Sequence, residues 1–246
     1  LAASIGRTRL QVYSPLDVAV FSTGDELRKP GLPLPIGCIY DANRYTLVAA
    51  LKQMGCRVTD LGILADNPYA VQQALAEAAG SHQLLITSGG VSVGDEDHVC
   101  DAVKFLGKLH FWRLAIRPGR PVALGQVGTT AFIGLPGNPV AVMVTFLLIA
   151  RPLILRLSGA RDIAPTHYKV RAGFDHEKKK NRREFVRVRL HIEPDGTPVA
   201  KKFPREGAGI LTSLVESDGL VELPEEMTLL TAGNMVDFMP FNELSR

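Results

Sequence analysis

Two patterns of hydrophobic and polar positions divide the chain of 246 residues. In the first part, short apolar runs alternate with longer stretches in which apolar residues recur at helical spacing. The runs span residues 18–21, 58–63 and 84–86, and the helical stretches span residues 43–54, 69–79 and 98–106. This alternation is typical of βαβ units, so it predicts a mainly parallel sheet covered by helices.

The second pattern begins after about residue 164. Apolar and polar residues alternate over residues 168–174 and 186–192, as in strands that bury one face. Turn signals at residues 194–196 and 218–219 separate further short strands. The alternation predicts a small all-β, barrel-like domain.

Together the two patterns predict an α/β fold with two domains. A three-layer α/β/α domain is expected at residues 17–164, and the β-barrel domain at residues 165–246. Residues 1–16 do not begin with methionine, and we expect them to be the remnant of a preceding domain.

Two helices can be outlined in more detail. In the first helical stretch, Asn43 is expected to cap the start and Gly55 to mark the exit. The most apolar segment, residues 140–157, is interrupted by Arg151, Pro152 and Arg156. A membrane span needs about 20 uninterrupted residues, so this segment is predicted to be a buried helix and no membrane partner is expected.

Composition narrows the class of protein. The chain is 46% hydrophobic and 22% charged, with a formal net charge of +3, which is ordinary for a globular protein. Its three cysteines are too few and too scattered for a disulfide framework or a Cys-x-x-Cys metal site. A reducing cytoplasm is therefore the expected location.

A basic run at residues 178–183 invites a nucleic-acid interpretation. Residues 165–246 nevertheless contain 13 Lys or Arg against 13 Asp or Glu, whereas nucleic-acid binding needs a net basic face. We interpret the run as a solvated hairpin tip and expect no nucleic-acid partner.

The strongest candidate for chemistry is the loop at residues 87–97, which reads TSGGVSVGDED. It joins a buried strand to a helix, and its glycines can turn backbone NH groups inward beside the positive helix end. That arrangement favours phosphate. In the alternative interpretation, the glycines only make a turn and Asp95 or Asp97 caps the helix.

Polar residues also follow other predicted strands. Acids occur in residues 22–27, at Asp41 and at Asp66, and residues 134–139 read GLPGNP. Ligands of open α/β sheets bind at the carboxyl ends of strands. Clustered carboxylates beside phosphates indicate Mg²⁺, which prefers a few hard oxygen ligands. Each acid alone is also explained by a cap or an Asx turn.

A pair of arginines lies between these motifs. If residues 113–117 are extended, Arg113 and Arg117 share one face of a strand that leads into Pro118-Gly119. Two guanidinium groups on one face can bind a small oxyanion. Surface salt bridges explain the spacing equally well.

Four motifs in order resemble one enzyme family. Residues 22–27 (STGDEL), 88–94 (SGGVSVG), 115–119 (AIRPG) and 134–139 (GLPGNP) are similar to those of the molybdopterin molybdenumtransferases, which are related to the gephyrin E domain. The resemblance extends over nearly the whole chain. It implies that adenylylated molybdopterin and molybdate react in the presence of Mg²⁺ to give molybdenum cofactor and AMP, and it implies a homodimer.

The resemblance also implies roles for single residues. Glu26, Asp66 and Asp97 would be the catalytic acids and metal ligands, and the molybdate site is assigned to Arg113, Arg117, Gly119 and Arg187. The implied pterin-nucleotide pocket comprises Thr23, Asp25, Ser88, Gly90, Ser92, Gly94, Asp95, Pro136, Gly137, Asn138 and Pro139, to which the ends of the predicted elements add Gly24, Asp41, Asn43 and Gly89.

The chain departs from the family in three ways. The family's longer N-terminal half is absent, so this chain alone is expected to be poorly active. Arg113 and Arg117 stand where lysine is common, and Ala208 stands where the family often has serine. Two alternatives remain: an adenylyltransferase of the related molybdopterin-binding fold, and a non-catalytic pterin-binding or scaffold module. The extra β domain favours the first assignment over the adenylyltransferase.

Overall fold

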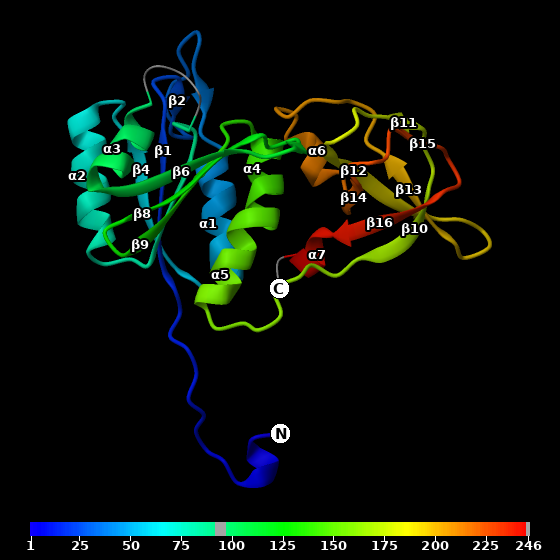
Figure 1. Ribbon diagram of the computed structural model, residues 1–246, viewed down its shortest axis with the longest axis horizontal. Helices are drawn as coiled ribbons and strands as arrows, with labels where there is room; N and C mark the ends of the chain where they lie inside the picture. The colour runs from blue at the N-terminus through cyan, green and yellow to red at the C-terminus, as the bar shows by residue number, and fades with distance from the viewer. Residues whose placement is uncertain (92–96, 245–246) are drawn as a thin grey trace.

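A computed structural model describes residues 1–91 and 97–244, and its first domain is a six-stranded sheet between two layers of helices (Figure 1). The strand order is β4 (Arg57–Leu64), β1 (Asp17–Thr23), β5 (Leu84–Ser88), β9 (Thr130–Leu135), β8 (Pro121–Val127) and β6 (Gly107–Arg113). The first four strands run parallel and the last two run antiparallel to their neighbours. The prediction of a three-layer α/β domain with a mainly parallel sheet is confirmed.

Alternate residues of the central strands face two separate cores. Val18 and Val20 of β1 pack with the helices α1 (Asn43–Gln53) and α4 (Pro139–Thr145). Ala19 and Phe21 of the same strand pack on the other face. That face is covered by α2 (Pro68–Ala79) and α3 (His98–Leu106). Burial on both faces explains why these strands are nearly continuous apolar runs.

The helix starts show which polar residues serve the backbone. Asn67 caps α2 by accepting bonds from the backbone NH groups of the next turn, and Asp97 caps α3 by accepting from the NH of Cys100 at 2.9 Å. The prediction for α1 is wrong, because Asn43 makes no cap and Asp41 accepts from the NH of Arg44 instead. The expected exit glycine, Gly55, does adopt a positive φ of 81°.

The apolar segment forms one continuous helix from α4 through a π-helical turn (Phe146–Ala150) to α5 (Arg151–Leu157). Pro139 occupies its first turn, and Asn138 stands at the cap position without a side-chain cap bond. By length and composition alone this helix of 19 residues could cross a membrane, yet 56% of its apolar window is buried inside the fold. It packs against the sheet as a core helix, as predicted.

The second domain is a closed barrel of five strands (Figure 1). The strands follow the order β13 (Pro198–Lys202), β10 (Tyr168–Ala172), β16 (Met235–Pro240), β14 (Gly219–Leu223) and β12 (Arg183–Ile192), and β12 pairs with β13 to close the barrel. Val170, Val186, Val188 and Phe238 fill its interior. This confirms the predicted barrel-like domain.

The barrel domain also contains elements that the period-two pattern does not predict. A short ladder joins β11 (His176–Glu177) to β15 (Leu229–Leu230). A one-turn helix, α6 (Thr212–Val215), lies between β13 and β14, so the all-β description is wrong at this point. A second turn of helix, α7 (Phe241–Leu244), follows the last strand.

The two domains share a sheet through β7 (Ile116–Arg117), which pairs in parallel with the start of β12. The outer side of the barrel also packs into the α/β core, through Phe185, Leu220 and Met239. This pairing overturns the predicted continuous strand at residues 113–117. Arg113 ends β6 and Arg117 belongs to β7, because the NH of Leu114 bonds to the carbonyl of Arg120 at 2.8 Å and closes a turn.

The basic run is not simply a solvated tip. Lys178 is buried, and its Nζ donates to the carbonyl oxygens of Pro224 at 2.8 Å and Met227 at 2.6 Å, among four in all. Arg183 pairs with Glu222 and Glu225. The run therefore holds the β11–β12 connection against the loop between β14 and β15. Its exposed lysines are Lys179 and Lys180.

Two segments project from the first domain (Figure 1). Residues 1–16 form an extended arm with one 3-10 turn (Ala3–Ile5), and the ring of Tyr13 lies against Gly159. The second projection is the connection between β2 (Leu27–Arg28) and β3 (Ile39–Tyr40), which pair in parallel.

Candidate functional site

A cleft of about 520 Å³ lies between the two domains. The α/β domain contributes residues 89–91, 117–121, 136–138 and Ala141 to its lining, and the barrel domain contributes residues 184–187, 206–208, His176 and Lys202. Residues 89–91 follow the end of β5 and residues 136–138 follow the end of β9, where open α/β sheets bind their ligands, and residues 117–121 connect β7 to β8.

The glycine-rich loop forms one wall of the cleft. Gly89 and Gly90 have φ angles of 87° and 63°, a region that favours glycine. The NH of Gly89 bonds to the carbonyl of Leu135, which ties the loop to the neighbouring strand. A Cβ on Gly90 would lie 2.5 Å from Oγ1 of Thr23 and 2.8 Å from Val99. The backbone at Gly90 therefore lies close to β1 and α3.

The turn after β9 forms the next part of the wall. A Cβ on Gly137 would meet nothing within 4 Å, so this residue faces open space. Asn43 donates from Nδ2 to the carbonyl of Gly137 at 2.6 Å. Asn43 therefore positions the cleft backbone from the start of α1, a role that its place beside a helix start does not reveal.

The opposite wall carries positive charge. Arg187 donates from Nη1 to the carbonyl of Gly207 and to Ser213, and its buried Nε has no hydrogen-bond partner among the described residues. Burial lowers the pKa of Arg187, as does the charge of Arg117, whereas Glu206 raises it. A buried NH group without an acceptor is costly, and Arg187 lines the cleft, so this guanidinium is a candidate to bind an anion there.

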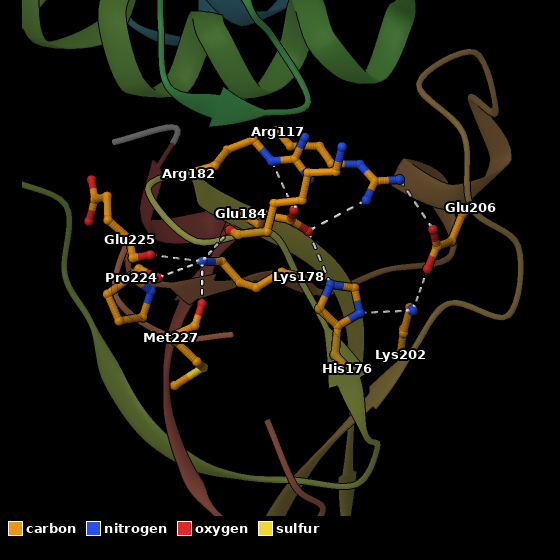
Figure 2. Close-up of polar contacts among 11 residues, drawn as sticks. Arg117, His176, Lys178, Arg182, Glu184, Lys202, Glu206, Pro224, Glu225 and Met227 are labelled. Atoms are coloured by element: carbon orange, nitrogen blue, oxygen red, sulfur yellow. Dashed lines mark hydrogen bonds and ion pairs between the residues drawn. The ribbon is translucent and has the colours of Figure 1, made fainter. Parts of the chain in front are cut away.

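A closed ring of ionisable side chains, the charged ring, forms part of the cleft lining (Figure 2). Glu184 lies 3.1 Å from Nε2 of His176, whose Nδ1 lies 3.1 Å from Nζ of Lys202. Lys202 pairs with Glu206 at 2.6 Å, Glu206 with Arg117 at 3.3 Å, and Arg117 with Glu184 at 3.7 Å. Each member thus has partners on both sides.

The two acids of the ring differ in burial. The side chain of Glu184 is 3% exposed and also receives bonds from Arg182, whereas that of Glu206 is 50% exposed. Burial raises the pKa of Glu184, but the bonds from His176 and Arg182 outweigh it and the net pKa is lowered. The bond from Lys202 lowers the pKa of Glu206. Both acids are therefore charged at neutral pH.

Among the sequence-predicted site residues, the cleft brings together Gly89, Gly90, Arg117, Gly119, Pro136, Gly137, Asn138 and Arg187. Thr23 and Ser88 are buried at the ends of β1 and β5, and Pro139 begins α4. Gly24, Asp25 and Glu26 form a turn between β1 and β2. Ser92, Gly94 and Asp95 lie outside the described residues.

Two predicted binding residues have other neighbours. Asp41 is buried and bonds to Nε of Arg44 at 2.8 Å, and Arg44 also pairs with Asp60. Asp41 therefore holds the start of α1. Arg113 is exposed and is not part of the cleft lining, because the turn after β6 separates it from Arg117.

The three predicted metal ligands do not form a three-acid site in the described part of the chain. Within residues 1–91 and 97–244, no three His, Cys, Asp or Glu side chains are grouped so as to hold a metal ion. Glu26 and Asp66 are exposed at the ends of β1 and β4, whereas Asp97 is buried at the start of α3. The described residues therefore supply no preformed three-acid site, and the assignment of Glu26, Asp66 and Asp97 as metal ligands stays a prediction.

Sequence reasoning missed the barrel side of the cleft apart from Arg187. His176, Glu184, Lys202 and Glu206 stand in β11, β12, β13 and the following loop. No motif joins them, since they meet only when the barrel closes. The one local signal is Glu184, which occupies an alternate position of β12 whose later members, Val186, Val188, Leu190 and Ile192, are apolar.

Family models match both domains. A model described as "Probable molybdopterin binding domain" matches residues 19–156, which is more than half of the chain. A second model, "MoeA C-terminal region (domain IV)", matches residues 169–241.

Similar proteins carry related names. A molybdopterin molybdenumtransferase of Haemophilus influenzae is 38% identical over 99% of this chain and 61% of its own length. One from Nostoc sp. is 36% identical over 93% of this chain and 53% of its own length. The solved "molybdopterin biosynthesis moea protein" of Pyrococcus horikosii superposes with a TM-score of 0.80 and 28% identity, covering 98% of this chain and 58% of that one. The chain thus spans between 53% and 61% of these proteins.

Proposed function

The chain belongs to the molybdopterin-binding domain family of MoeA-like proteins, and from this premise we propose that it takes part in molybdenum insertion. The reaction combines adenylylated molybdopterin with molybdate and releases molybdenum cofactor and AMP. The observation that carries the proposal is the cleft itself, in which a glycine-rich phosphate-type loop faces a cationic wall.

The two walls divide the substrates between them. Backbone NH groups near Gly90 and Gly137, beside the starts of α3 and α4, suit the phosphates of the nucleotide. Arg117 and Arg187, with the backbone at Gly119, suit the molybdate dianion. Each charge-assisted hydrogen bond to such an anion contributes roughly 1.5 to 3 kcal/mol. Binding both substrates in one cleft places the oxyanion beside the pterin adduct, which converts a bimolecular step into an effectively unimolecular one.

Mg²⁺ enters the proposal as an ion shared with the substrate. Mg²⁺ is usually held by one or two carboxylates together with phosphates and water, so it does not need the three-acid cage. The candidate carboxylates are Glu26, Asp66 and Asp97. A bound Mg²⁺ would neutralise charge that develops on the departing phosphate. Isothermal titration of Mg²⁺ with and without AMP tests this, since the ion should bind more tightly when AMP is present.

The decisive experiment is an AMP-release assay. Adenylylated molybdopterin, molybdate and Mg²⁺ are incubated with this chain and with a form that carries the N-terminal half found in the longer relatives. Molybdate-dependent AMP release by the longer form supports the proposal. Pyrophosphate release from ATP and molybdopterin would instead indicate the adenylyltransferase, and binding without either reaction would indicate a scaffold module.

Assembly and location complete the proposal. We propose a homodimer for the longer form and a reducing cytoplasm for both. Light scattering coupled to size-exclusion chromatography measures the mass of each form, and a monomeric longer form would contradict the first of these expectations.

A further inference from the structure

Glu206 occupies an unusual place in the charged ring. It lies in the loop between β13 and α6, and its two carboxylate oxygens take different cations: Oε1 binds Lys202 at 2.6 Å and Oε2 binds Arg117 at 3.3 Å. Both cations line the cleft. The carboxylate therefore bridges two groups that an oxyanion in the cleft would also use.

The other acid of the ring is fixed in place. Glu184 is 3% exposed and is held by Arg182 and His176 at its two oxygens. Its departure would leave these partners uncompensated in a buried site, which is strongly unfavourable. Glu206 is half exposed and adjoins Gly207, whose φ of 141° suits only glycine. Of these two acids, Glu206 is the one that can leave.

We propose that Glu206 is an internal counter-ion of the anion subsite: its carboxylate pairs with Lys202 and Arg117 in the free protein, and a tetrahedral oxyanion displaces it on binding. This inference rests on the proposed oxyanion subsite in the same cleft. It adds two residues, Glu206 and Lys202, to those that set the affinity of that subsite.

Displacement sets a threshold for binding. Every anion that enters must first break the two pairs of Glu206, so the same cost is subtracted from the affinity of each anion. A dianion that gains several charge-assisted bonds still binds. A weak monoanion, which gains little beyond what Glu206 already supplies, fills the site only at high concentration.

The test is a calorimetric titration of sodium molybdate into the parent chain and three variants. Glu206→Gln removes the carboxylate charge, and Glu206→Asp keeps it. Glu193→Gln is the matched control, because Glu193 pairs with Lys201 at 3.9 Å outside the cleft. Exposed pairs have modest strength, so Glu206→Gln is expected to bind molybdate roughly two- to thirtyfold more tightly. Glu206→Asp and Glu193→Gln should stay close to the parent.

A second titration identifies displacement as the cause. Nitrate is titrated as a competitor of molybdate at constant ionic strength. Because the displacement cost is shared, Glu206→Gln should strengthen both anions by the same factor. If Glu206→Gln instead lowered the log Kd of molybdate about twice as far as that of nitrate, Glu206 would stay in place and only repel charge. That result would overturn the proposal.

The remaining outcomes separate the inference from the function it rests on. If the parent binds molybdate and Glu206→Gln binds it equally or more weakly, Glu206 only positions Lys202 and Arg117, and the counter-ion proposal fails alone. If neither the parent nor Glu206→Gln binds molybdate, the oxyanion subsite itself fails and takes the inference with it.

Discussion

At Gly90 the backbone of the cleft tolerates only glycine. At Gly90, the left-handed φ and the contacts with Thr23 and Val99 both oppose a side chain. We expect Gly90→Ala to lower the free energy of unfolding by about 2–3 kcal/mol and to weaken nucleotide binding. Gly128→Ala is the control, because Gly128 has a similar φ of 58° with nothing within 4 Å. Urea denaturation measures both; equal losses would show that sterics at Gly90 are unimportant.

The two arginines that the sequence places on one predicted strand are expected to behave differently. Arg117 lines the cleft, whereas Arg113 is exposed outside its lining. Arg117→Ala should weaken molybdate binding tenfold or more, because one charge-assisted bond corresponds to roughly 1.5 kcal/mol or above. Arg113→Ala should change it little. Titration with molybdate measures both, and an equal loss in the two variants would return Arg113 to the subsite.

Lys178 has a structural role within the basic run. Its ammonium group donates to buried carbonyl oxygens, so Lys178→Met should cost about 2–4 kcal/mol of unfolding free energy. Lys180→Met, at an exposed position, should cost less than about 0.5 kcal/mol. Thermal and urea denaturation distinguish them. Equal stability of the two variants would restore the solvated-tip interpretation.

At the scale of an element, β12 connects the barrel to the rest of the molecule. The ionisation of Glu184, near its start, makes the stability of the protein depend on pH. The net pKa of Glu184 lies below its ordinary value of 4.5. Its contribution to stability is therefore complete above about pH 4.5 and disappears as the pH falls through the lowered pKa of the folded state.

The lowered pKa of Glu184 predicts how its replacement in β12 changes stability at different pH values. Glu184→Gln should lower the melting temperature at pH 7, because it leaves Arg182 and Arg117 without a buried carboxylate, at a cost of about 3 kcal/mol. The difference between parent and variant should shrink below pH 4.5. Glu216→Gln, at an exposed site, is the control. A difference that is constant from pH 3 to pH 7 would contradict the ionic role of Glu184.

The sequence predicts elements well where the signal is local. The helices α2 and α3 follow from apolar spacing and from Asn67 and Asp97 at their starts. The sequence predicts elements poorly where a strand pairs with residues that are far away along the chain. The break between β6 and β7 depends on the bond between Leu114 and Arg120 and on the pairing of β7 with β12, and neither has a signature in residues 113–117.

At the scale of the whole molecule, the same distinction applies to the site. Gly89, Gly90 and the turn at Gly137 could be predicted, because each motif contains its own geometry. His176, Lys202 and Glu206 could not, since they come from separate barrel strands and loops and meet across the cleft. Sequence patterns therefore predict one wall of the cleft, and the closure of the barrel determines the other.

Because both domains line the cleft, an anion bound there should slow the exchange of backbone amide hydrogens with solvent in both. Molybdate at about one hundred times its Kd should stabilise the protein by about 2.7 kcal/mol. Hydrogen exchange followed by mass spectrometry should then slow together in residues 116–121 and 203–208, while residues 193–197 at the far turn of the barrel serve as the internal control. Slowing confined to one domain would contradict a shared subsite.

The pairing of β7 with β12 has a consequence for how this protein can be divided. A gene fusion that moved residues 165–246 to a new host would leave Ile116 and Arg117 behind, and with them one neighbour of Glu184. The transplanted barrel would keep its five strands but would lose the pairing of β7 with β12, which orients its charged ring. Although the chain reads as two modules in series, its smallest transplantable unit comprises both.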